Sequence, residues 1–199
     1  MTLETSPDRK AVTSAPIEDV LAWRWSPRSF DVNAVLTDEE VQSILEAARW
    51  APSAVNFQPR RFVVGKRGTP TFEKIASHLT SNNKVWAPNA SLLILVIAVK
   101  ADGSHEGARA NPWAEYDTGQ AAANIVFQAH ALGLHAHQMA GMEVEDMRKA
   151  FALPAHFSPI TTIAIGKVAE ADLLPDDLRA RETAERTRLP LGELILQQD

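Results

Sequence analysis

Two arginines and a serine lie within five residues near the start of the chain, in Arg24-Trp25-Ser26-Pro27-Arg28. Guanidinium groups bind phosphate through paired hydrogen bonds, and a serine hydroxyl adds a neutral donor. The apolar spacing from Ile17 to Arg24 predicts a helix, and Ser26-Pro27 predicts its end. The segment is therefore a candidate anion site at a helix end. Solvated arginines are an equally good interpretation of these residues alone.

A second pair of arginines lies near the end of the chain, in the segment from Glu185 to Pro190. In an extended segment Arg186 and Arg188 project to the same side, where they could clamp a dianion. Taken alone, the segment is better interpreted as a solvated charged tail, because charged side chains usually face water.

A third segment, Ala51 to Pro59, combines small residues with hydrogen-bonding side chains. Small residues allow a flat ligand to approach the backbone closely, and Ser53, Asn56 and Gln58 can form hydrogen bonds with it. Proline, serine and asparagine are also common in turns. An ordinary helix-to-strand loop is therefore the favoured interpretation of this segment alone.

Hydrophobic periodicity predicts the helices and strands that must position these segments. Thr37 and Glu40 form a capping box, which starts a helix that Pro52 ends. The stretch from Leu92 to Val99 is apolar on both faces, as a central strand covered on both sides requires, and Ile160 to Val168 predicts a second buried strand. Further elements are a strand expected over residues 61–65 and helices expected over residues 72–79 and 143–152.

The longest predicted helix runs from about Trp113 to Leu132 and ends at Gly133. Its centre, Ala121 to Ala129, is apolar on nearly every side, which predicts burial in a core or at a subunit interface. Helices that alternate with apolar strands predict an α+β fold with a mixed central sheet flanked by helices, and the apolar helix predicts a homodimer. We expect a flexible segment over residues 1–15 and a single domain over residues 16–199, with a C-terminal arm from about residue 173.

The composition excludes several classes of protein. The chain has 199 residues, of which 45% are hydrophobic and 23% charged, and these values predict an ordinary globular domain. The absence of cysteine excludes disulfides, thiolate nucleophiles and cysteine-ligated metals, and the net charge of −5 argues against nucleic acid as a partner. No stretch suggests a membrane span or a secretory signal, so we expect no membrane partner and a cytoplasmic location.

Common phosphate, dinucleotide and hydrolase motifs are missing. The sequence has no G-x-G-x-x-G after a strand, no Walker A motif, no G-x-S-x-G and no H-E-x-x-H. His135-Ala-His137 offers two imidazoles to a metal from alternate positions of a strand, but no third ligand lies at a convincing spacing. We therefore expect surface or interface histidines here rather than a metal site.

Taken together and in order, these segments resemble the motifs of the nitroreductase family of FMN-dependent NAD(P)H oxidoreductases. The resemblance runs from about Ile17 to Leu196. The motifs that carry it are Arg24 to Phe30, Ala51 to Arg60, Asn83 with Trp86 and Ala90, Asp117 with Gly119, Ala121 and Asn124, Ala140-Gly141-Met142, and Arg186 with Arg188 and Pro190. Trp25 and Ala54 stand where the family usually has a basic residue and a second serine.

This resemblance implies a site for flavin mononucleotide (FMN) that two subunits share. One subunit would hold the phosphate and ribityl chain through Arg24, Ser26, Arg28, Arg186 and Arg188, with Trp25 contributing backbone and packing. The other subunit would line the ring with Pro52, Ser53, Ala54 and Asn56. The pyrimidine edge would bond Asn83, and backbone groups of Ala140 and Gly141 would face the flavin N5.

The resemblance also implies a ping-pong reaction. NADH or NADPH would reduce the flavin, and a small-molecule acceptor such as a nitroaromatic or a quinone would then oxidise it. The cofactor carries this chemistry, so no catalytic acid–base residue is expected. Two alternatives stay open: another flavin reaction on the same fold, such as flavin fragmentation or enal or semialdehyde reduction, and a flavin-binding protein without turnover. The stretch from Ala101 to Pro112 is expected to contribute to the lid that selects the acceptor.

Overall fold

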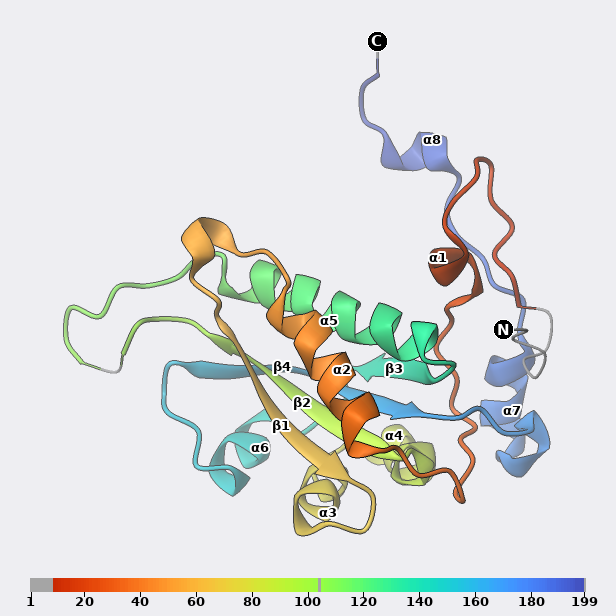
Figure 1. The fold of residues 1–199 in the computed structure, drawn as a ribbon, viewed down its shortest axis with the longest axis horizontal. Helices are drawn as coiled ribbons and strands as arrows, with labels where there is room; N and C mark the ends of the chain where they lie inside the picture. The colour runs from red at the N-terminus through yellow and green to blue at the C-terminus, as the bar shows by residue number, and fades with distance from the viewer. Residues whose placement is uncertain (1–8, 104, 199) are drawn as a thin grey trace.

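The computed structural model describes residues 9–103 and 105–198, which fold around a four-stranded sheet (Figure 1). The strands are β1 (Arg60–Lys66), β2 (Leu92–Val99), β3 (His135–Met139) and β4 (Phe157–Gly166), in the order β1-β2-β4-β3. Their register pairs Phe62 with Val96, Ile94 with Ile163 and His137 with Ala164.

Each pair of neighbouring strands in this sheet is antiparallel. The expected α+β class is confirmed, and the structure corrects the expectation of a mixed sheet. The mixed sheet is predicted from alternating helices and strands, but the alternation does not determine the direction of a strand. The helices α3 (Pro70–Ser77) and α4 (Ser81–Trp86) join β1 to β2 at one end of the sheet, so β2 runs back beside β1 (Figure 1).

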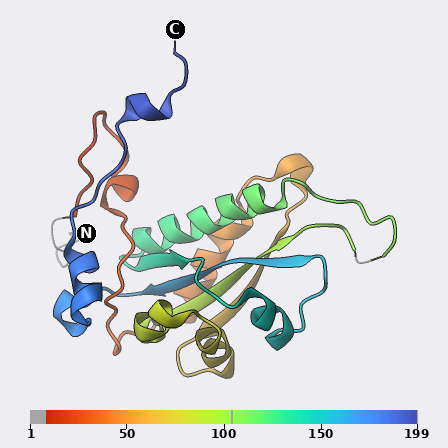
Figure 2. The same cartoon turned by 180° about the vertical axis from the view of Figure 1, so that it is seen from behind.

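The side chains of β2 alternate between two hydrophobic cores, one on each face of the sheet. Its odd-numbered residues from Leu93 to Ile97 lie in one core, with residues of α3, α4 and α6 (Val144–Ala150). Its even-numbered residues from Leu92 to Val96 lie in the other core, with residues of α2 (Asp38–Arg49) and α5 (Ala114–Ala131). Both views show this layering, and it confirms the expected central strand covered on both sides (Figure 2).

Local signals set the ends of the two long helices. The Thr37 hydroxyl accepts a hydrogen bond from the Glu40 backbone at 3.1 Å, and the Glu40 carboxylate accepts one from the Thr37 backbone at 2.8 Å. These bonds complete the predicted capping box. α5 ends just before Gly133, whose φ of 75° favours glycine. α5 packs on α2 and the sheet, while Tyr116 near its start is 70% exposed.

The two terminal regions lie together at one end of the sheet (Figure 1). There, α1 (Asp19–Trp23) lies beside the arm that follows α7 (Asp176–Thr183), and the arm continues to α8 (Leu191–Leu194), which extends away from the rest of the chain. A guanidinium nitrogen of Arg9 donates to the carbonyl of Ala184 at 2.9 Å, so the N-terminal segment runs beside the arm. Residues 1–8, which belong to the segment expected to be flexible, lie outside the described residues.

The arm exposes apolar side chains to solvent. Leu191 and Leu194 in α8 and Leu196 beyond it are all exposed in the isolated chain.

Single-turn 3-10 helices over Ala54–Asn56, Ala87–Asn89 and Ala171–Leu173 connect the longer elements. Among the described residues, no helix combines the length and apolar character needed to cross a bilayer.

Candidate functional site

The two arginine segments, which are 162 positions apart in the sequence, meet beside α1. Arg186 Nη2 donates to the carbonyl of Arg24 at 2.9 Å. Arg186 Nη1 donates to the carbonyl of Ala22 at 2.9 Å and also to the carbonyl of Arg9. Because a guanidinium presents several N–H donors in one plane, this side chain ties the arm to two earlier segments. Arg186 therefore holds the arrangement together.

Arg9, Arg24, Arg186 and Arg188 form a cationic cluster. Burial and then the charge of Arg188 lower the pKa of Arg24, and burial followed by the charges of its three neighbours lowers the pKa of Arg186. Across residues 9–103 and 105–198, no carboxylate lies within salt-bridge distance of these side chains. Like charges without a counter-charge repel one another, so the cluster favours a bound multivalent anion.

Arg24 and Arg188 keep most of their donors available for a ligand. Arg24 Nη1 donates to Ser26 Oγ at 3.2 Å, and Arg188 Nη1 donates to the carbonyl of Thr187 at 2.7 Å. Within the described part of the chain, these are the hydrogen bonds that the two guanidinium groups make. The structure thus brings Arg24, Arg186 and Arg188 together but gives them different contacts. Arg186 already binds backbone carbonyls, whereas Arg24 and Arg188 keep donors for an anion.

Arg28 lies in the same turn but is held by a residue that sequence analysis missed. The carboxylate of Glu182, on α7, accepts the backbone N–H of Arg28 at 2.9 Å and that of Ser29 at 3.1 Å. The Glu182 side chain is buried, and the Arg28 guanidinium lies 3.8 Å from it. Burial lowers the pKa of Arg28, and the charge of Glu182 opposes that effect. Glu182 lies in a strongly charged helix, so the spacing of apolar residues in the sequence does not indicate that its side chain is buried.

Trp25 packs beneath the cationic cluster. Its side chain is only 5% exposed, and the Arg9 guanidinium lies 4.3 Å from the centre of its ring. The edge of the ring faces His135, with the two ring centres 6.0 Å apart. This contact orients Arg9 by a cation–π interaction and supports the turn that carries Arg24.

A group of histidines lies behind this turn. His130 and His135 are both less than 9% exposed, and their ring centres lie 5.4 Å apart. His137 Nδ1 lies 2.8 Å from the carbonyl of Pro27, and its ring centre lies 4.6 Å from that of Trp86. Burial is the main cause that lowers the pKa of both His135 and His137 to about 4. Both rings are therefore neutral at pH 7.

Of the expected surface or interface positions, the structure corrects the first, because His135 is buried and His137 half-buried within the chain. β3 is an edge strand, but Trp25 and the carbonyl of Pro27 cover the side on which these rings lie. Among the described residues, no group of three or more histidine, cysteine, aspartate or glutamate side chains is placed to hold a metal ion.

Asn83 and Gly141 lie in contact at the other end of β3. Asn83 Nδ2 donates to the carbonyl of Gly141 at 3.0 Å, and the backbone N–H of Thr80 donates to the same carbonyl at 3.0 Å. A Cβ atom on Gly141 would lie 2.5 Å from Thr80 Oγ1 and 2.6 Å from Asn83 Nδ2. A side chain at position 141 would displace the Thr80 and Asn83 side chains, so glycine keeps the Ala140-Gly141 backbone in contact with the start of α4.

The loop from Pro52 to Asn56 is strained. Val55 and Asn56 have φ values of 43° and 58°, and Gln58 has a φ of 51°. The backbone N–H of Ala54 donates to the buried carboxylate of Asp117 at 3.0 Å, and Ser53 Oγ accepts from the backbone of Gln58 at 3.0 Å. Left-handed backbone at non-glycine residues persists only where surrounding contacts enforce it, and it concentrates at binding sites.

The strained loop and the cationic cluster lie at opposite ends of α5 (Figure 1). The loop is bonded to Asp117 in the first turn of the helix, whereas the turn around Trp25 packs beside His130 and His135 at its other end. An 18-residue helix is about 27 Å long, which is longer than one FMN molecule. One chain therefore does not bring Pro52, Ser53, Ala54 and Asn56 together with Arg24, Arg28 and Arg188.

Comparison with known proteins identifies the family. The nitroreductase family model matches residues 21–85 and 65–167. A protein of Methanothermobacter thermautotrophicus, named as a candidate NADH dehydrogenase/NAD(P)H nitroreductase, is 32% identical over 80% of this chain and 81% of its own length.

Solved structures agree. An oxidoreductase containing FMN superposes with a TM-score of 0.90 and 34% identity, covering 98% of both chains. A candidate nitroreductase of Desulfovibrio desulfuricans in complex with FMN superposes with a TM-score of 0.72 and 30% identity, covering 94% of this chain and 99% of its own. With the family model spanning most of the chain, this protein belongs to the nitroreductase family.

Proposed function

We propose that this chain is an FMN-dependent NAD(P)H oxidoreductase that reduces electron-poor small molecules such as nitroaromatics or quinones. The observation that carries the proposal is the cationic cluster, in which Arg24 and Arg188 offer donors to an anion and have no carboxylate partner among the described residues. The two solved relatives whose titles name FMN support the identity of that anion.

The residues present fit this cofactor in charge and in the hydrogen-bond donors that they offer. The phosphate would lie on Arg24 and Arg188, and Arg9 Nε, which is buried without a hydrogen-bond partner, adds an unused donor to the same cluster. The ring would lie near Ala140-Gly141, whose backbone is held in place by the hydrogen bonds that the Gly141 carbonyl accepts from Thr80 and Asn83. FMN, once bound, supplies the hydride chemistry between NADH or NADPH and the acceptor in a ping-pong sequence.

The chain's own residues bind the FMN and orient it. Arg24, Arg188 and Ser26 hold the phosphate end, and Arg186 keeps the arm in place through the carbonyls that it binds. The Asn83 side chain, oriented by its hydrogen bond to Gly141, is available to the pyrimidine edge of the ring. The neutral histidines behind the turn add no further positive charge at pH 7.

We further propose that the site is completed by a second copy of the chain, since the two sets of site residues lie at opposite ends of α5. Sedimentation equilibrium is expected to give a homodimer at micromolar concentration. Deleting residues 190–199, which carry the exposed leucines of the arm, should weaken the dimer. A monomer at every concentration that nevertheless binds FMN would contradict the two-subunit site.

The activity is tested first by the absorbance spectrum of the purified protein. We expect a flavin spectrum that bleaches on anaerobic addition of NADH or NADPH and returns when a quinone or nitroaromatic is added. A flavin that resists both nicotinamides would favour another flavin reaction or a flavin-binding protein without turnover. A protein that cannot be loaded with FMN would overturn the proposal.

A further inference from the structure

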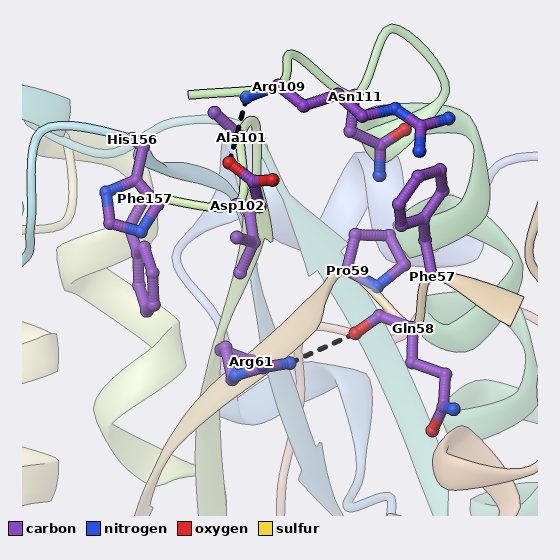
Figure 3. Close-up of a pocket in the computed structure, with 11 residues that line it drawn as sticks. Phe57, Gln58, Pro59, Arg61, Ala101, Asp102, Arg109, Asn111, His156 and Phe157 are labelled. Atoms are coloured by element: carbon purple, nitrogen blue, oxygen red, sulfur yellow. Dashed lines mark hydrogen bonds between the residues drawn. The ribbon is translucent and has the colours of Figure 1, made fainter. Parts of the chain in front are cut away.

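A cavity of about 270 Å³ lies beside the strained loop, outside the groups assigned above to the flavin (Figure 3). It opens between the start of β1 and the excursion that follows β2, where Ala101 pairs with Ala110. The residues that carry its chemistry are Phe57, Gln58, Arg61, Asp102, Arg109 and Asn111. The cavity therefore lies between the residues that follow the Pro52–Asn56 loop and the stretch predicted to form a lid.

Two arginines in this cavity are held in place by neutral groups. Arg61 Nη1 donates to the carbonyl of Gln58 at 3.0 Å and to that of Arg60 at 2.7 Å. The Arg109 guanidinium lies 4.8 Å from the centre of the Phe57 ring, and Figure 3 shows the two side chains together at the rim. Aromatic and carbonyl contacts orient a guanidinium without cancelling its charge.

The carboxylate in the cavity lining, that of Asp102, already accepts a backbone hydrogen bond. Asp102 Oδ1 accepts the backbone N–H of Arg109 at 2.8 Å. Over residues 9–103 and 105–198, neither Arg61 nor Arg109 has a carboxylate within salt-bridge distance. The cavity lining therefore carries two guanidinium charges against a single carboxylate, which favours an anionic ligand.

A buried amide adds a neutral donor. Asn111 is only 7% exposed, and its Oδ1 accepts the backbone N–H of Trp113 at 3.1 Å. Its amide nitrogen is turned toward the space between Arg109 and Pro59 (Figure 3). Buried polar groups are nearly always hydrogen-bonded, so this nitrogen can donate a hydrogen bond to a ligand oxygen.

We propose that this cavity is an oxyanion subsite, which binds the carboxylate or phosphate of a ligand whose reacting end lies on the flavin. The proposal rests on the proposed function, because it takes the Pro52–Asn56 loop as a wall of the flavin ring. Phe57 follows that loop directly in the chain, so the part of the subsite that Phe57 lines lies within about 10 Å of the loop. The oxyanion is a carboxylate on an aromatic acceptor or the 2′-phosphate that distinguishes NADPH from NADH.

Paired ligands that differ only in the anion test the subsite. We would measure kcat/KM for 4-nitrobenzoate against 4-nitrobenzyl alcohol, and for NADPH against NADH, in the Arg61→Gln and Arg109→Gln variants. Lys149→Gln is the control, since Lys149 is an exposed cation on α6 that pairs with Asp146. One of the two ratios should fall roughly fivefold or more in both test variants and stay constant in the control. A fall in the nitrobenzoate ratio identifies a carboxylate, and a fall in the NADPH ratio identifies a phosphate.

Unchanged ratios in both variants, with turnover intact, would overturn the subsite and leave the proposed function standing. If the protein binds no FMN or oxidises neither nicotinamide, the proposed function fails instead. Calorimetric titration with 4-nitrobenzoate and with inorganic phosphate then decides the subsite. Binding that weakens in both arginine variants supports it, and binding that is absent or unaffected by them overturns it.

Discussion

Replacing Arg188 with alanine is expected to weaken FMN binding by about 10- to 100-fold. A hydrogen bond to a charged group contributes about 1.5–3 kcal/mol, and this side chain offers its donors to the phosphate. In the free chain its one hydrogen bond within the described residues goes to the neighbouring carbonyl of Thr187. The substitution should therefore not lower the free energy of unfolding of the flavin-free protein, since it also removes the repulsion between Arg188 and Arg24. Fluorescence titration with FMN and urea unfolding measure the two quantities.

Arg186→Ala is the informative comparison, because the guanidinium of Arg186 binds backbone carbonyls at Ala22 and Arg24. Its loss should lower both FMN affinity and the free energy of unfolding, since it removes the Arg186 bond to the Arg24 carbonyl and leaves the Ala22 carbonyl with the backbone N–H of Ala11 as its donor. Lys149→Ala, far from the cationic cluster in sequence and exposed on α6, controls for a general loss of positive charge. Full flavin retention and normal turnover in Arg188→Ala would contradict its role as a phosphate ligand.

Acidification is expected to destabilise the protein through His135 and His137. The usual histidine pKa of about 6.5 is lowered to about 4 for both rings in the folded chain, chiefly by burial. As the pH falls below 6.5, the unfolded chain binds protons that the folded chain does not. The stability from each neutral ring is therefore present above pH 6.5 and is lost progressively down to pH 4. Between pH 7 and pH 5 this linkage costs about 2 kcal/mol per histidine.

Urea unfolding at pH 7 and pH 5 measures this loss. A His135→Phe variant should show a difference between the two pH values that is smaller by about 2 kcal/mol, whatever its stability at pH 7. His78→Gln removes a half-buried ring at the C-terminal end of α3, outside the histidine group behind the turn, and is the matched control for loss of a histidine. An identical pH dependence in wild type and His135→Phe would show that this ring is not held neutral by the fold.

Features encoded within a few residues could be predicted from the sequence. The capping box of Thr37 and Glu40 and the end of α5 at Gly133 depend on local hydrogen bonds and backbone conformation. The double burial of β2 is visible as an unbroken apolar run. The order of the arginine and loop segments was enough to indicate the family, which the comparisons confirm.

The direction of the strands and the division of labour among the site residues depend on contacts that are distant in sequence. Glu182 lies more than 150 positions along the chain from Arg28 and Ser29, whose backbone N–H groups it accepts. Arg186 likewise lies more than 150 positions from Arg24, whose carbonyl it binds. No local pattern encodes such contacts. The burial of His135 follows from Trp25 packing over β3. Only the tertiary structure places the Pro52–Asn56 loop and Arg24 at opposite ends of α5, because the packing of that helix, rather than its sequence, decides what lies at each end.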